Sequence, residues 1–157
     1  MHRHDAYLRR VTGDQRALLK FHDLSELNLS NANLREAKLT SARLRHINLD
    51  GATLQDAGLF SADLAGASLR AADLTQADLR GAFLKGADLT EAKLIRADLR
   101  EGTLARYVAA RNPVAVTLDG ACVNLSDVTA RRADFSHCRL AKSFVVKTDF
   151  TDVILHN

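Results

Sequence analysis

The stretch "ADLTQADLRGAFLKGADL", residues 72–89, repeats itself every five residues, with leucine as the recurring residue. Leucine occupies every fifth position from Leu19 to Leu104. Alanine stands two places before most of these leucines, and the exceptions are His22, Leu27, Ile47 and Gly102. A period of five, kept over this length, indicates an internal repeat of one small structural unit.

A period of five excludes the common regular elements. On an α-helix, residues five apart are separated by roughly 140°, so the leucines would spiral around the helix and no stripe could face a core. On a flat strand, an odd period places successive leucines on opposite faces. The chain must therefore turn within each unit, and the small and polar residues after each leucine, such as "TQ", "RG" and "DG", favour turns. Short sides joined by turns predict a solenoid.

The units "ANLRE", "ADLAG", "ADLTQ", "ADLRG" and "ADLTE" carry a resemblance to a known family. The sequence resembles the pentapeptide-repeat family, whose pattern is A-(D/N)-L-x-x, strongly over residues 17–104 and more loosely over 123–155. The resemblance implies an all-β solenoid, a right-handed quadrilateral β-helix with four pentapeptides in each coil. It also implies that the leucine and the residue two before it point inward, which would place His22 inside the first coil.

The repeat is interrupted after Leu104 and resumes at Leu125, which is 21 residues later. This distance equals one four-sided coil plus one residue. We therefore expect an irregular coil over 105–122 that carries a short bulge or loop near Arg106–Pro113. A loop that projects from about 105–113 is the alternative.

Four segments follow from this pattern. Residues 1–16 form an N-terminal cap, with a short helix expected over 4–12, because Asp5 lies near its start and Gly13 follows its end. Residues 17–104 form the regular β-helix, 105–122 form the irregular coil or loop, and 123–157 form the C-terminal repeat coils.

Composition restricts the class of protein. The formal net charge is +3, the repeat body is close to neutral, and direct nucleic-acid binding normally needs a stronger basic stripe. Two cysteines, Cys122 and Cys138, fit no zinc spacing and no disulfide framework, which favours a reducing cytoplasm. Charges recur too often for a membrane span, and the N-terminus lacks an apolar signal core. We expect a cytoplasmic protein without a membrane association.

The sequence offers little for catalysis. The histidines are scattered, and no carboxylate or cysteine accompanies them at a ligand spacing, so we expect neither a metal nor a cofactor. Aspartates recur just before the leucines, but the period explains them as outward corner residues better than as a catalytic cluster. We expect a protein that is not an enzyme.

The sequence therefore predicts a rigid rod that binds a protein partner. Its most distinctive surface is the interrupted segment, where we expect exposed partner-binding residues at Arg106, Tyr107, Arg111 and Asn112.

A second surface is expected on the C-terminal coil. Phe144 and Val146 flank an inward position and point outward, and together with Phe150 they suggest self-association. Several members of the family that the sequence resembles dimerise through their C-terminal coils, which implies a homodimer.

Two alternatives remain open. Some relatives are quinolone-resistance proteins that imitate duplex DNA and bind DNA gyrase, although the missing negative charge counts against such mimicry here. The chain is alternatively a targeting or accessory domain of a larger system.

Overall fold

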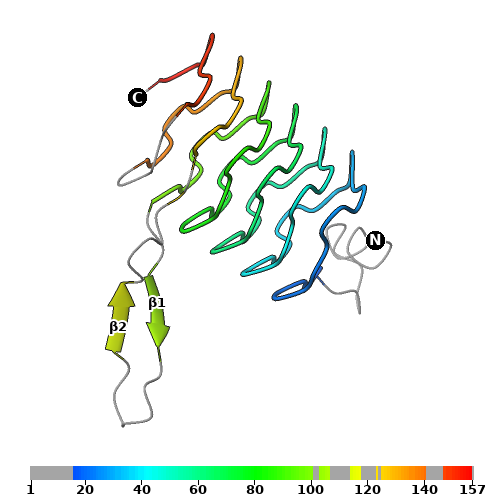
Figure 1. The fold of residues 1–157 in the computed structure, drawn as a ribbon, viewed down its shortest axis with the longest axis vertical. Helices are drawn as coiled ribbons and strands as arrows, with labels where there is room; N and C mark the ends of the chain where they lie inside the picture. Colours follow the sequence, from blue (N-terminus) through cyan, green and yellow to red (C-terminus); the bar gives the residue numbers. More distant parts are fainter. Residues whose placement is uncertain are drawn as a thin grey trace.

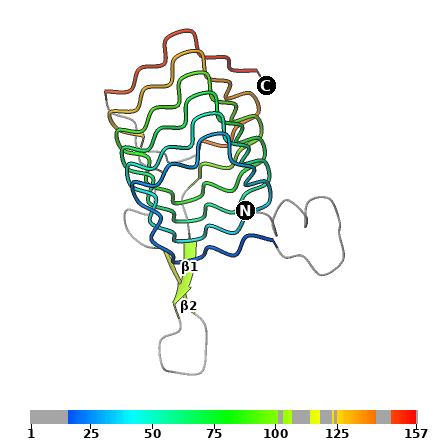
Figure 2. The ribbon, with the colours of Figure 1, turned by 90° about the vertical axis from the view of Figure 1, so that its right-hand side faces the viewer.

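The computed structural model describes residues 16–100, 103–106, 114–117, 123, 125–140 and 147–156. The chain winds into a stack of similar coils (Figures 1 and 2). Neighbouring coils are joined by parallel bridges between residues 20 apart, beginning with Leu18 to Lys38 and Asp23 to Arg43. A bridge recurs every five residues, so each coil has four sides, and the predicted solenoid is confirmed.

Each side ends in a tight turn two residues after its central leucine. At the first corner, the N–H of His22 donates to the C=O of Leu19 at 3.3 Å, and Phe21 between them has a φ of 62°. A positive φ at the third residue is the requirement of a type II turn, which favours glycine. Non-glycine residues occupy most of these corners, including Ala71 with a φ of 53°, and each costs roughly 1–2 kcal/mol.

Hydrogen bonds between coils hold these corners in place. The N–H of Phe21 donates to the C=O of Thr40 at 3.1 Å, and the N–H of Leu19 donates to the C=O of Lys38 at 2.8 Å. The same two bonds recur on most of the sides above, so most of the strained corners are tied to the next coil.

The core is a narrow shaft of leucine and alanine. In the middle coils these side chains are completely buried, for example Leu64 and Ala62 at 0% exposure. The prediction that leucine and the residue two before it point inward is confirmed there. It is wrong for His22, which is exposed and whose Nδ1 lies 2.9 Å from the C=O of Lys20.

The interruption is not an irregular coil, which corrects the favoured prediction. Asp88 bridges directly to Thr129, a separation of 41 residues instead of 20, so 21 residues add no layer to the stack. Part of this segment forms strands β1 (Thr103–Arg106) and β2 (Val114–Thr117), which pair antiparallel. The strands stand clear of the stacked coils (Figure 1).

Leu104 belongs to the insertion and not to a side of the stack. It lies in β1 opposite Val116, and Leu99 is the last leucine of the unbroken series that packs in the shaft. The coils on either side of the insertion stay aligned, since Lys93 bridges to Asp134 and Asp98 bridges to Arg139 at the same separation of 41.

The helix predicted over residues 4–12 lies outside the described residues. Within the part of the chain that the structure describes, no helix is long and apolar enough to cross a bilayer.

Replacing Leu64 by alanine tests the packed shaft. Leu64 is 0% exposed, so the cavity left behind should lower the free energy of unfolding by about 2–5 kcal/mol, measured by urea denaturation. The control is Leu18→Ala on the first described coil, where the side chain is 60% exposed and the loss should stay below about 0.5 kcal/mol. Equal losses in the two variants would contradict a dry, close-packed shaft.

Candidate functional site

The outward aspartates and asparagines hold the turns together. The side-chain oxygen of the residue before the central leucine accepts the backbone N–H two positions later, as in an Asx turn. Asp73 accepts from Thr75 at 3.0 Å, and Asn28 accepts from Ser30 at 3.0 Å. The same bond is made by Asp23, Asn33, Asn48, Asp63, Asp78, Asp88, Asp98, Asp134 and Asp149. This bond gives the recurring aspartates a structural role.

Among the turn-capping carboxylates, Asp98 and Asp149 have a pKa below the usual value because donors converge on them. The hydroxyl of Thr151, the guanidinium of Arg131 and the N–H of Thr151 lower the pKa of Asp149 to about 2. The guanidinium of Arg100 likewise lowers the pKa of Asp98, although partial burial opposes it. These groups stay ionised over the physiological pH range.

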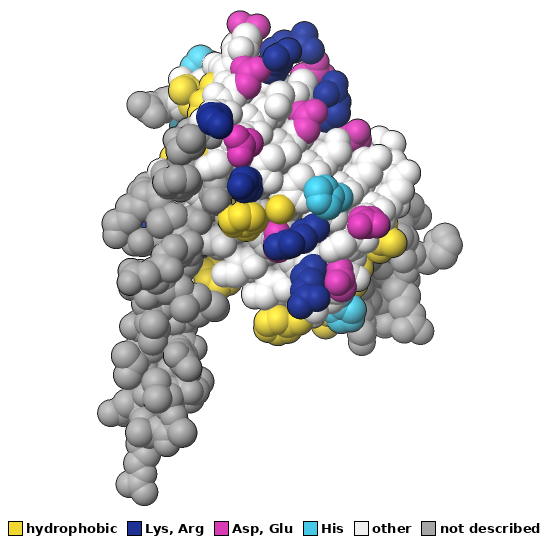
Figure 3. All heavy atoms as spheres, in the orientation of Figure 1, with side chains coloured by type: hydrophobic (Ala, Val, Ile, Leu, Met, Phe, Trp, Pro, Cys, Tyr) yellow, Lys and Arg dark blue, Asp and Glu magenta, His cyan; other side chains and the backbone are white. Residues whose placement is uncertain are grey.

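Arginine and aspartate alternate along the faces of the stack. Arg80 and Arg100 each form two bonds to the aspartate two residues before, with the shorter one at 2.7 Å. The guanidinium of Arg80 also lies 5.5 Å from the centroid of the Phe60 ring, within the range of a cation–π contact. In the space-filling view, side chains of both signs are interspersed over the visible face (Figure 3). The visible face therefore presents no single-sign surface.

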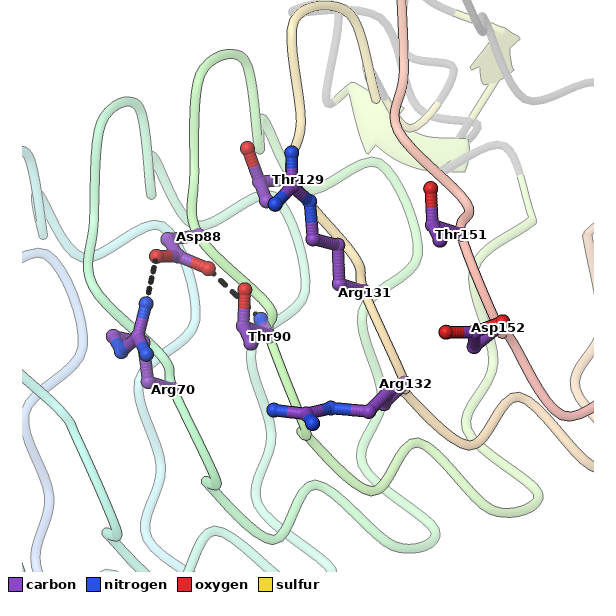
Figure 4. A pocket seen from close by; sticks show the side chains of 8 residues that line it. All are labelled: Arg70, Asp88, Thr90, Thr129, Arg131, Arg132, Thr151 and Asp152. Atoms are coloured by element: carbon purple, nitrogen blue, oxygen red, sulfur yellow. Dashed lines mark hydrogen bonds and ion pairs between the residues drawn. The ribbon is translucent and has the colours of Figure 1, made fainter.

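One groove crosses this pattern, with a volume of about 430 Å³. It lies on the face that carries Arg70, and its lining comes from four successive coils (Figure 4). The lining residues are three arginines, three threonines and two aspartates: Arg70, Asp88, Thr90, Thr129, Arg131, Arg132, Thr151 and Asp152. The sequence contains no local signal for this groove, because residues on both sides of the insertion form it.

Cys138 is not an activated thiol. Burial raises its pKa to about 12, and its Sγ lies 2.6 Å from the C=O of Leu94. Among the described residues, no group of three or more histidine, cysteine, aspartate or glutamate side chains could hold a metal ion.

The predicted partner-binding residues fall on the insertion. Arg106 ends β1, where it pairs with Val114 of β2. Tyr107, Arg111 and Asn112 lie outside the described residues, so their places stay predictions.

The predicted self-association surface falls on the last coil. Phe150 is 39% exposed and meets Phe135 edge to face, with 5.9 Å between the ring centroids. Phe144 and Val146 lie outside the described residues. Leu140, Ile154 and Leu155 of the same coil are also exposed, at 39%, 41% and 68%.

A family model of pentapeptide repeats matches the chain in 8 copies, over residues 23–56, 67–104 and 121–157. No curated protein matches the chain.

Solved structures of repeat proteins are similar to this chain. The pentapeptide repeat protein Rfr23 from the cyanobacterium Cyanothece 51142 aligns with a TM-score of 0.51 and 19% identity, over 88% of each chain, which shows the fold alone. HetL from Nostoc sp. strain PCC 7120 is 30% identical over 89% of this chain and 68% of that chain, with a TM-score of 0.42. Full-length QnrB1, a plasmid-mediated fluoroquinolone resistance protein, is 17% identical over 86% and 82%, with a TM-score of 0.44. At these two TM-scores, the similarity to HetL and QnrB1 says nothing about the function of this chain.

Replacing Asp149 by asparagine tests the capping carboxylates. The folded pKa of about 2 lies below the unfolded value of about 3.9, so this carboxylate stabilises the fold above about pH 4, and the stabilisation is lost as the pH falls through about 2. An asparagine caps the turn but does not titrate, so Asp149→Asn should lose less stability than the wild type between pH 4 and pH 2 in urea denaturation.

The control is Asp127→Asn, because Asp127 makes no ion pair and caps no turn among the described residues. The free energy of unfolding of this variant should change with pH as it does in the wild type. If the free energy of unfolding of Asp149→Asn also falls with pH as in the wild type, the Asp149 carboxylate does not stabilise the fold in this way.

Proposed function

The chain belongs to the pentapeptide-repeat family, and we propose that it is a non-enzymatic rod that binds a protein partner through the inserted β1–β2 strands. The observation that carries this proposal is the register of the insertion. Twenty-one residues leave the stack and return without displacing a coil, since Asp88 still meets Thr129. A segment that contributes no layer to the stack is free to serve another purpose.

The two strands have the character of a binding element. Their sheet has only two strands, pairing Thr103 with Thr117 through Arg106 with Val114, and each outer edge keeps unpaired backbone groups within the described residues. A two-stranded sheet is marginally stable by itself. Contact with a partner would stabilise it, and the neighbouring predicted contacts are Tyr107, Arg111 and Asn112.

Deleting residues 101–121 tests this proposal. The deletion joins "ADLR" to "CVNLS", which restores the five-residue spacing between Leu99 and Leu125. The variant should therefore keep a cooperative urea transition and the wild-type circular dichroism. In affinity capture followed by mass spectrometry, it should lose the proteins that the intact chain retains.

The control for this experiment is the double variant Arg106→Ala, Tyr107→Ala, which keeps the insertion length. It should weaken capture without abolishing the fold. A folded deletion variant that captures the same proteins would overturn the assignment.

We propose in addition that the last described coil pairs with the same coil of a second copy. Phe150, Ile154 and Leu155 expose apolar surface there. The N–H groups of Phe150 and Leu155 donate to no other described residue, whereas their equivalents in earlier coils donate to the coil above. Exposed strand edges of this kind favour association with another chain.

The variants Phe150→Glu and Leu155→Glu test the dimer by size-exclusion chromatography with light scattering. The intact chain should elute with twice the mass of 17.2 kDa, and each variant should elute as a monomer. The control is Phe83→Glu, because Phe83 has a similar exposure of 37% on a middle coil. A wild-type monomer, or a dimer that survives both changes, would rule out this interface.

The two remaining candidates have weaker support. DNA mimicry would need rows of unpaired carboxylates, but Asp63, Asp88 and Asp98 all lie against arginine. A supercoiling assay with DNA gyrase distinguishes this candidate, since a rod of the proposed kind leaves gyrase active. The third candidate, a targeting or accessory domain, would show its partner in the same capture experiment.

A further inference from the structure

The groove of Figure 4 lies at a turn whose capping position holds neither aspartate nor asparagine. On this face, Asp88 accepts the N–H of Thr90 at 2.9 Å, and Asp149 accepts the N–H of Thr151 at 3.0 Å. On the coil between them, the capping position holds Thr129. Threonine provides no carboxylate there, and the N–H of Arg131 forms no hydrogen bond with any described residue.

The same face contains a second position of this kind, and there a carboxylate fills it. Ser68 takes the capping position, and its hydroxyl donates to Oδ1 of Asp50 at 2.5 Å. The N–H of Arg70 donates to the same oxygen at 3.0 Å. Asp50 thus reaches up from the preceding coil and completes the turn, so one carboxylate oxygen receives a hydroxyl and a backbone N–H.

The groove repeats this arrangement without its carboxylate. Thr129 takes the place of Ser68, and Arg131 takes the place of Arg70. The separation of 20 residues between Asp50 and Arg70 becomes 41 between Thr90 and Arg131, because the insertion lies between them. Thr90 therefore stands in the position of Asp50, and Thr90, Thr129 and Arg131 all line the groove.

Three guanidinium groups surround this space. Arg70 uses Nη1 in its ion pair with Asp88 at 2.9 Å, Arg131 uses Nε in its pair with Asp149 at 2.6 Å, and Arg132 pairs through Nη2 with Glu91. Each pair occupies one nitrogen of a group that carries five N–H donors. All three side chains are more than half exposed, so the other donors can turn toward a ligand. The remaining lining carboxylate, Asp152, opposes an anion and limits its affinity.

We propose that this groove binds an oxyanion, a phosphate or a carboxylate, with one oxygen in the position that Asp50 fills on the earlier coil. That oxygen accepts the hydroxyl of Thr129 and the N–H of Arg131, and its neighbouring oxygens accept from the arginines. Guanidinium groups suit both anions, because their planar donors match two oxygens at once. This site is separate from the β1–β2 strands and does not depend on the proposed partner.

Titration of the ¹⁵N-labelled chain with inorganic phosphate at low ionic strength tests the site, with sodium chloride as the ionic-strength reference and succinate as the carboxylate probe. The amide resonance of Arg131 should shift downfield and saturate with at least one of the two anions. A lower half-saturation concentration for phosphate identifies a phosphate ligand, and a lower one for succinate identifies a carboxylate ligand. A linear shift that follows ionic strength with both anions would overturn the proposal.

Two variants at Thr129 sharpen the test. Thr129→Asp supplies the missing carboxylate from within, so it should weaken anion binding at least tenfold while the remaining resonances stay in place. Thr129→Val has nearly the same shape and removes only the hydroxyl, so it should weaken binding by a smaller factor. The matched control is Thr53→Asp, a threonine in the same capping position on another face, which should keep wild-type binding. Unchanged affinity in both Thr129 variants, or an equal loss in the control, would refute the site.

Discussion

Backbone hydrogen bonds between coils are the interaction on which the rest of this structure depends. Each side donates to the side 20 residues further along the chain, as Leu19 does to Lys38. This pairing forces every side to have the same length and every corner the same shape. It also holds residues such as Ala71 at a positive φ, a conformation that each would avoid in isolation. Burial of leucine and alanine in the shaft stabilises the fold and offsets the free-energy cost of the strained corners.

The same constraint explains where the chain can vary. A residue on an outward position meets only its neighbours on the same face, so a face can carry paired charges, such as Arg80 with Asp78, without altering the coils. An insertion is tolerated if it leaves and returns at one corner, because the pairing on the other sides continues, as it does between Lys93 and Asp134. Function in such a rod is therefore expected in its insertions, at its last coil and at outward positions that depart from the repeating pattern.

Much of the stack was predictable because its signal is local. The resemblance of the repeat to the pentapeptide-repeat pattern implies which side chains turn inward, and the structure buries Leu64 and Ala62 accordingly. The structural role of the outward aspartates was also predicted, and the turn-capping bonds supply its physical reason. For the path of the insertion, the favoured irregular coil was wrong, and the projecting loop was the alternative that the sequence left open. A distance of 21 residues fits an extra coil as well as an excursion, and only the bridge from Asp88 to Thr129 distinguishes the two.

The sequence by itself determined the repeating unit, since a leucine at every fifth residue requires a turn within each unit and therefore a solenoid, and the resemblance to pentapeptide repeats implies four sides in each coil. Tertiary structure decided which outward residues become neighbours. Thr90 and Thr129 share a groove because the stack closes over the insertion, whereas Asp50 completes the equivalent turn two coils earlier. Stacking brings together residues from distant parts of the chain, and a periodic sequence offers no local signal for which pairs will meet.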